Sequence, residues 1–110
     1  MAEFRTTDIG LMETTTGYTR IVPPPPSGQF KIEDGGIIIQ NTTTTDHNLV
    51  LEIRRGTTIV KIYDNDLFKK ETFIWEDVIR IPSDFTGIFA KLTVAPAKKP
   101  SVYYTGTQDA

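Results

Sequence analysis

Short runs in which apolar and polar residues alternate fill residues 36 to 105, and this period of two most constrains the fold. Successive side chains of a β-strand point to opposite faces, so such a run gives a strand with one buried face, whereas a helix needs a period of about 3.6 residues. Turn residues separate the runs about every 8 to 12 residues, as in a sandwich or small barrel. The sequence therefore predicts an all-β protein, an antiparallel β-sandwich of about seven or eight strands. Its predicted core is Leu49, Leu51, Ile53, Val60, Ile62, Ile88, Leu92 and Val94.

The composition restricts the function. The 110 residues suffice for one domain. The net charge is −2 and the charges are interspersed, so no basic stripe exists to neutralise phosphates, and we expect no nucleic-acid partner. Cysteine is absent, which excludes thiolate chemistry and fits synthesis in a cytoplasm. The N-terminal residues hold no long apolar run, so we expect neither a signal peptide nor a membrane partner.

The N-terminal residues differ from the rest of the chain. Residues 1–17 are polar and rich in threonine, and their isolated apolar residues follow neither period. Such a segment buries too little apolar surface to order itself, because fixing the backbone costs about 1 to 2 kcal/mol per residue. We expect an extended N-terminal arm over 1–17, either frayed or ordered by a neighbouring subunit, a sandwich domain over 18–106 and a tail over 107–110. The apolar residues of the arm are Phe4, Ile9, Leu11 and Met12.

Proline and glycine mark the expected strand ends. Prolines 23–26 cannot donate to a β-ladder, so they should form a stiff spacer after a strand at 18–22. Asp34-Gly35-Gly36 is a turn signal, which predicts that 29–33 and 37–40 pair as a hairpin. A second hairpin is expected around 54–57, a break at 64–66 and a long aromatic strand over 71–81. The successive isoleucines 37–39 indicate a strand covered on both faces, by the subunit itself or by a partner.

No group of residues in the sequence specifies a reaction. His47 is the only histidine, and a lone histidine in a threonine-rich loop is most often a solvated residue rather than a metal ligand. The acidic segment 64–66 offers oxygen ligands but lacks the glycine and the bidentate acid of an EF-hand. Neither a nucleophile elbow nor a phosphate-binding loop is present. We therefore expect no enzyme, and no catalytic, cofactor-binding or metal-binding residue.

The aromatic residues are the remaining concentrated signal. Phe73 and Trp75 share one face of the predicted strand over 71–81. Such residues usually fill the interior of a sandwich. An exposed Trp75 beside polar side chains would instead form a platform for a sugar.

The succession of segments resembles a known family. It consists of an extended arm, a proline-containing entry, IIIQNT at 37–42, LVLEIRRG at 49–56, an aromatic strand and SVYYTG at 101–106. This order resembles the small β-sandwich virion proteins of tailed bacteriophages, most of all the capsid decoration, or staple, proteins of epsilon15-like phages. The resemblance covers most of residues 18–106 and implies a jelly-roll-like fold.

The same resemblance implies a non-enzymatic role. A decoration (cement or staple) protein is made in the host cytoplasm, binds the outer surface of the icosahedral head and stabilises contacts between major capsid subunits. Its partners would be the major capsid protein and neighbouring copies of itself, and the arm could add a strand to a neighbour's sheet. We expect partner contacts at Phe4, Ile9, Leu11, Met12, Ile37, Ile38 and Ile39.

Two other classes of function stay open. A carbohydrate-binding or tail adsorption module would use Trp75 and Tyr63. A head-completion or tail ring protein would assemble into a ring.

Overall fold

The computed structural model describes residues 3–11, 17–41, 46–92 and 101–109, and the side chains of 17–41, 46–92 and 101–108. These ranges contain nine β-strands and no helix. The strands are β1 Glu3–Leu11, β2 Thr19–Val22, β3 Gln29–Gln40, β4 His47–Arg55, β5 Thr58–Leu67, β6 Thr72–Ile74, β7 Ile79–Pro82, β8 Gly87–Leu92 and β9 Ser101–Asp109.

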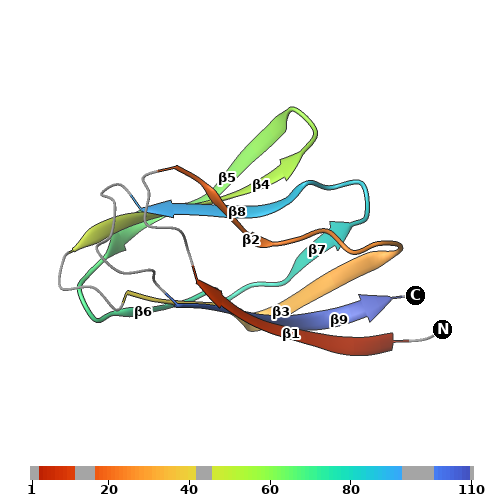
Figure 1. Ribbon diagram of the computed structural model, residues 1–110, viewed down its shortest axis with the longest axis horizontal. Coiled ribbons are helices and arrows are strands. Elements are labelled where there is room, and N and C mark those ends of the chain that lie inside the picture. The colour runs from red at the N-terminus through yellow and green to blue at the C-terminus, as the bar shows by residue number, and fades with distance from the viewer. Residues whose placement is uncertain (1–2, 12–16, 42–45, 93–100, 110) are drawn as a thin grey trace.

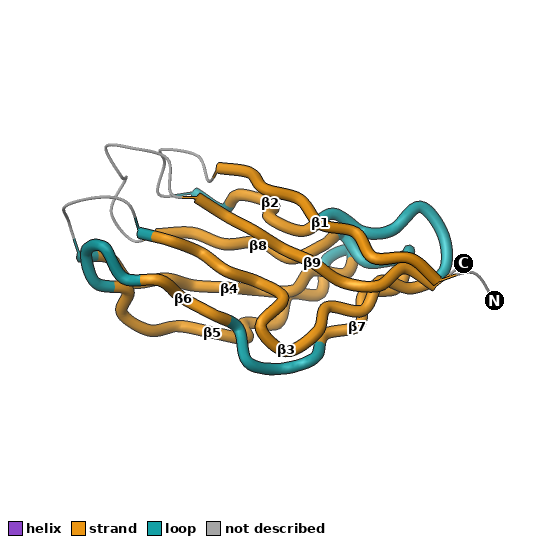
Figure 2. The backbone as a smooth tube through the Cα atoms, turned by 90° about the horizontal axis from the view of Figure 1, so that it is seen from below, coloured by secondary structure: helices purple, strands orange, loops and turns teal. Residues whose placement is uncertain are grey.

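The strands form two antiparallel sheets that face each other (Figure 1). One sheet has the order β1-β9-β3-β6, with β7 also paired to β3, and the other has the order β2-β8-β4-β5. In the view of Figure 2, β1, β9 and β3 run side by side across the molecule. This strand order is that of two interlocked Greek keys, which is the arrangement of a jelly roll. The predicted antiparallel, jelly-roll-like sandwich is confirmed.

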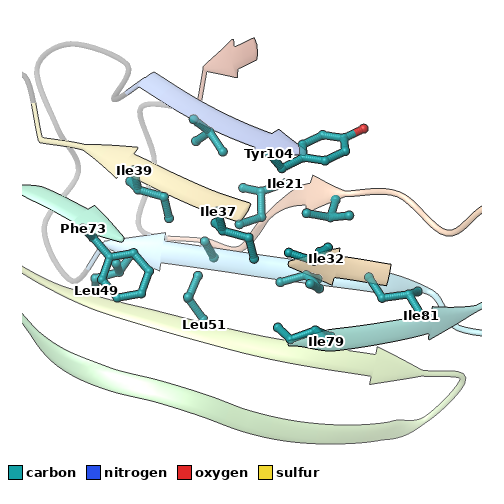
Figure 3. Packing of buried hydrophobic residues seen from close by; sticks show 14 of the residues in the cluster. Ile21, Ile32, Ile37, Ile39, Leu49, Leu51, Phe73, Ile79, Ile81 and Tyr104 are labelled. Atoms are coloured by element: carbon teal, nitrogen blue, oxygen red, sulfur yellow. The ribbon is translucent and has the colours of Figure 1, made fainter. Parts of the chain in front are cut away.

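Between the sheets lies one apolar core (Figure 3). Ile37 and Ile39 of β3 point toward Leu49 and Leu51 of β4, and all four side chains are fully buried. They occupy every second position of their strands, as the pleat requires. Of the predicted core, Leu49, Leu51, Ile88 and Leu92 are buried, while Ile53 and Ile62 are partly buried and pack against the cluster.

One predicted core residue is wrong. Val60 is 55% exposed, because the end of the β4–β5 hairpin is directed away from the opposite sheet (Figure 1). Val60 pairs with Ile53, and both residues line a shallow groove of about 350 Å³. Val94 lies outside the described residues.

The predicted hairpin around Asp34-Gly35-Gly36 does not form. Residues 29–40 make one continuous strand, β3, whose register with β9 shifts between Ile32 and Ile37. Gly35 has a φ of +76° and Gly36 sits where a Cβ would lie 2.7 Å from a side-chain atom of Ile32. The two glycines thus form a β-bulge rather than a turn, because β9 continues to pair with both halves of the strand.

Two other strand boundaries differ from the prediction. Strand β5 runs through the acidic segment 64–66 to Leu67, because each of these residues pairs with β4. The expected long strand over 71–81 is divided into β6 and β7, which pair with the two halves of β3 on the same edge.

Strand β1 lies at the edge of its sheet and pairs with β9 over its whole length, from Glu3 opposite Asp109 to Leu11 opposite Ser101. Residues 3–11 of the expected arm are thus extended, but their backbone joins the sheet of their own chain. The sequence pattern did not reveal this strand, because its scattered apolar residues follow neither the strand period nor the helix period. Strand β9 in turn extends to Asp109, into the expected tail.

Candidate functional site

An apolar row crosses the outer face of the β1-β9-β3-β6 sheet. Ile38 of β3 lies directly opposite Ile74 of β6 on one side and Tyr103 of β9 on the other. Directly opposed residues of an antiparallel pair lie on the same face, with Cβ atoms about 5 Å apart. Ile74 is 48% exposed, and Ile38 and Tyr103 are partly exposed. In the backbone register, Ile9 of β1 lies opposite Tyr103 on its other side.

The expected partner-binding residues therefore divide into three groups. Ile37 and Ile39 are fully buried in the core, because alternate residues of β3 face the other sheet. On this face the isoleucines are therefore covered by the subunit itself and not by a partner. Ile38 lies on the outer face, in the apolar row. Phe4, Ile9 and Leu11 belong to β1, where the backbone alone is described, and Met12 lies outside the described residues.

A cleft of about 510 Å³ opens where the edge strands β5 and β6 of the two sheets come together. It is lined by Tyr63, Leu67, Glu71, Thr72, Phe73, Ile74, Trp75, Glu76 and Asp77. The rings of Tyr63 and Phe73 have centroids 4.6 Å apart and are inclined at 50°. Thus Trp75 and Tyr63, the two residues of the sugar-platform alternative, line the same cleft although they come from opposite sheets.

The bulge in β3 holds Trp75 at this cleft. The Gly35 amide donates to the Trp75 carbonyl at 2.7 Å, and the Trp75 amide donates to the Ile37 carbonyl at 3.0 Å. Trp75, the residue after β6, is therefore hydrogen-bonded to both sides of the bulge. The indole is partly buried and packs against the core, and its Nε1 atom is buried without a hydrogen-bond partner among the described residues.

The cleft is acidic. Glu71, Glu76 and Asp77 are exposed, and within the described ranges neither lysine nor arginine lines the cleft. Oε1 of Glu71 accepts from the Phe68 amide at 3.3 Å. Burial raises the pKa of the Tyr63 hydroxyl, and the nearby charges of Glu71 and Asp66 raise it further.

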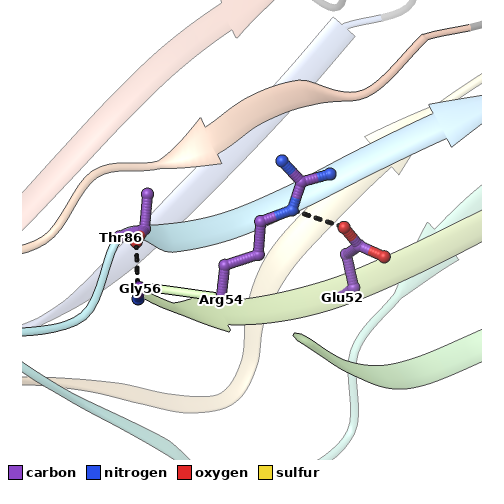
Figure 4. Close-up of polar contacts among 4 residues, drawn as sticks. All are labelled: Glu52, Arg54, Gly56 and Thr86. Atoms are coloured by element: carbon purple, nitrogen blue, oxygen red, sulfur yellow. Dashed lines mark hydrogen bonds and ion pairs between the residues drawn. The ribbon is translucent and has the colours of Figure 1, made fainter. Parts of the chain in front are cut away.

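A second polar cluster, not expected from the sequence, lies on the outer face of the β2-β8-β4-β5 sheet. Nε of Arg54 donates to Oε1 of Glu52 at 2.5 Å (Figure 4). The Arg54 guanidinium lies over the rings of Phe89 and Tyr18, 4.1 and 4.8 Å from their centroids, and Nζ of Lys91 lies 4.8 Å from that of Tyr18. Glu52 is buried at 4% exposure although it faces away from the core. A glutamate and an arginine two residues apart on one strand face were the signal for this cluster.

The remaining candidates for chemistry form no site in the described ranges. His47 is buried at the start of β4, at 4% exposure, so its expected place in a solvated loop is wrong. Asp64 bonds to Asn48 and Lys61, at 2.6 and 3.1 Å, and these contacts lower the pKa of its carboxyl. Three or more histidine, cysteine, aspartate or glutamate side chains that could hold a metal ion are nowhere grouped in the part of the chain that the structure describes.

Comparison with known proteins finds a likeness in structure but none in sequence. No protein-family model matches the chain, and no curated protein matches its sequence. A cryo-EM structure of a virus-like particle of the extra small virus of the giant freshwater prawn Macrobrachium rosenbergii aligns with all of this chain and 81% of its own. The identity is 10% and the TM-score is 0.46, so this likeness carries no inference about function. Across the described residues, no helix has the length and apolar character needed to cross a membrane.

Proposed function

We propose that this protein is a non-enzymatic structural component of a virion, a decoration (cement or staple) protein on the outer surface of a phage head. It would join neighbouring subunits of the major capsid protein and be made in the host cytoplasm. The observation that carries the proposal is the apolar row of Ile74, Ile38 and Tyr103 on an outer sheet face. Single exposed apolar residues are common on protein surfaces, but a contiguous row across neighbouring strands is typical of an interaction site.

The strand order supports the same role. Two-sheet jelly rolls occur in viral capsid proteins and in lectins, so the fold is compatible with a shell protein without specifying one.

The edge of the same sheet offers a second means of attachment. Among the described strands, β1 pairs with β9 alone, so its other edge could take up a strand of a neighbouring subunit. Ile9, which we expected to contact a partner, lies opposite Tyr103 in the register and so brings the arm and the apolar row together. The proposed docking surface is therefore the outer face of the β1-β9-β3-β6 sheet, with β1 at its border.

Co-sedimentation with shells tests this proposal. The shells are assembled from the major capsid protein encoded in the same genome, and the protein is added as wild type, Ile38→Lys or Ile59→Lys. Ile59 is 55% exposed and lies on β5 of the other sheet. Ile59→Lys is therefore a matched control, because it makes the same substitution at an exposed isoleucine away from the apolar row. We expect wild type and Ile59→Lys to sediment with the shells and Ile38→Lys to lose most of its binding. Equal binding of the two variants, or absence of binding by the wild type, would contradict the proposal.

A further inference from the structure

We infer that the cleft between β5 and β6 binds an organic cation, a guanidinium or alkylammonium group, on the rings of Trp75 and Tyr63 and beside the carboxylates of Glu71, Glu76 and Asp77. This inference does not depend on a role in a virion. It assigns a chemical class of ligand to the cleft that Trp75 and Tyr63 both line.

The charge of the cleft supports a cation. The three carboxylates take part in none of the ion pairs formed among the described residues, whose acidic members are Glu33, Glu52, Asp64 and Asp84. Glu76 accepts no hydrogen bond from a described residue, and Asp77 accepts only from the amide of the next residue, at 2.7 Å. The raised pKa of Tyr63 reflects the same negative surroundings. A cation entering the cleft would therefore meet uncompensated negative charge.

The rings of the cleft also lack the cation that the chain places over three other partly exposed aromatic residues, Tyr18, Phe85 and Phe89. Tyr18 and Phe89 lie beneath Arg54, and Phe85 lies beneath Arg55, whose guanidinium carbon is 5.7 Å from the ring centroid. In the described part of the chain, the rings of Tyr63, Phe73 and Trp75 have no such neighbour. The only polar atom of the Trp75 side chain is buried, so whatever ring surface it exposes is carbon. Tryptophan is the ring that attracts a cation most strongly.

Two other ligand classes fit less well. The described residues offer no group of ligands for a metal ion. A neutral sugar could stack on the same rings, but it would leave the charge of the carboxylates uncompensated. An organic cation would both stack on the rings and compensate the charge of the carboxylates.

Trp75 is the only tryptophan of the chain, so its indole N–H gives a single signal in a ¹H–¹⁵N spectrum. The full-length protein is titrated with acetyl-arginine amide, with choline and with the neutral trisaccharide chitotriose. Acetyl-arginine amide stands for a guanidinium on a polypeptide and choline for a quaternary ammonium headgroup. We expect at least one of the two cations to shift the signal at concentrations where chitotriose does not.

The matched variants are Glu76→Gln in the cleft and Asp84→Asn at the exposed ion pair with Arg55. Each removes one negative charge from an exposed position. We expect Glu76→Gln to weaken cation binding about two- to fivefold, as for an exposed ion pair, and Asp84→Asn to leave it unchanged. A shift caused by chitotriose and not by the cations would overturn the inference in favour of a sugar. Equal effects of the two variants, or an indole signal that none of the compounds moves, would also overturn it.

Discussion

The guanidinium carbon of Arg54 lies 4.1 Å above the centre of the Phe89 ring, on the outer face of the β2-β8-β4-β5 sheet. From this position Arg54 also bonds to Glu52, whose side chain is 6% exposed. Removal of one member of a buried ion pair leaves the other charge uncompensated, which makes such a removal strongly destabilising.

Arg54→Ala should therefore lower the free energy of unfolding by about 3 kcal/mol. Arg55→Ala is the neighbouring control, since Arg55 pairs with Asp84 at 63% and 54% side-chain exposure and should contribute less than about 1 kcal/mol. Urea denaturation measures both values. Similar losses in the two variants would show that Glu52 does not depend on Arg54.

The strand pairing of β9 with β3 depends on a glycine. A Cβ at Gly106 would lie 2.3 Å from the Lys31 carbonyl oxygen and 2.7 Å from Cζ of Phe30. Gly106→Ala should therefore destabilise the protein by at least about 2 kcal/mol, because backbone must move to admit the methyl group. Gly56→Ala meets no atom within 4 Å, but its φ of +59° should still cost about 1 kcal/mol. Thermal unfolding of both variants measures the difference, and a smaller loss at Gly106 would contradict the close approach of the two strands.

The core and the projecting hairpin should respond differently to truncation. Leu51→Ala removes a fully buried side chain and should cost about 2 to 5 kcal/mol. Val60→Ala, at a position with the same strand period but 55% exposure, should change stability by less than about 0.5 kcal/mol. Chemical denaturation distinguishes the two. A large loss at Val60 would mean that another part of the protein covers the hairpin end.

Stability should fall at alkaline pH through Tyr18. Burial raises the pKa of its hydroxyl, and its hydrogen bond to the Glu52 carboxylate adds to the shift. The folded state then holds this proton more tightly than the unfolded state, so the contribution is complete below the unfolded pKa of about 10 and is lost as the pH rises through the folded value. Tyr18→Phe should be less stable at neutral pH and should lose stability less steeply above pH 10. Parallel pH profiles of the two proteins would contradict this.

The sequence pattern predicted best at the strand centres that the opposite sheet covers. There the alternating residues Leu49 and Leu51 of β4 and Ile88 and Leu92 of β8 form the centre of the core. Val60 obeys the same period, but periodicity does not reveal where the opposite sheet ends. Likewise, Asp34-Gly35-Gly36 has the local chemistry of a turn, and only the pairing of β9 with both halves of β3 converts it into a bulge.

The candidate sites could be predicted only in part. Trp75, Tyr63 and Ile38 are recognisable individually as aromatic or apolar residues on strands. Their neighbours depend on the strand order. It leaves β5 and β6 at the edges of their two sheets, where residues of both line one cleft, and it places Ile38 between Ile74 and Tyr103. The Glu52–Arg54 pair was missed because polar positions of an alternating strand are normally taken to face water.

Cryo-EM reconstruction of shells with and without this protein tests the central claim most directly. The shells are those of the major capsid protein encoded in the same genome. We predict additional density on the outer surface, at the junction of neighbouring subunits, with the outer face of the β1-β9-β3-β6 sheet and the row of Ile74, Ile38 and Tyr103 against the shell. Shells without added density, or a fitted orientation in which this face points to solvent, would contradict the account.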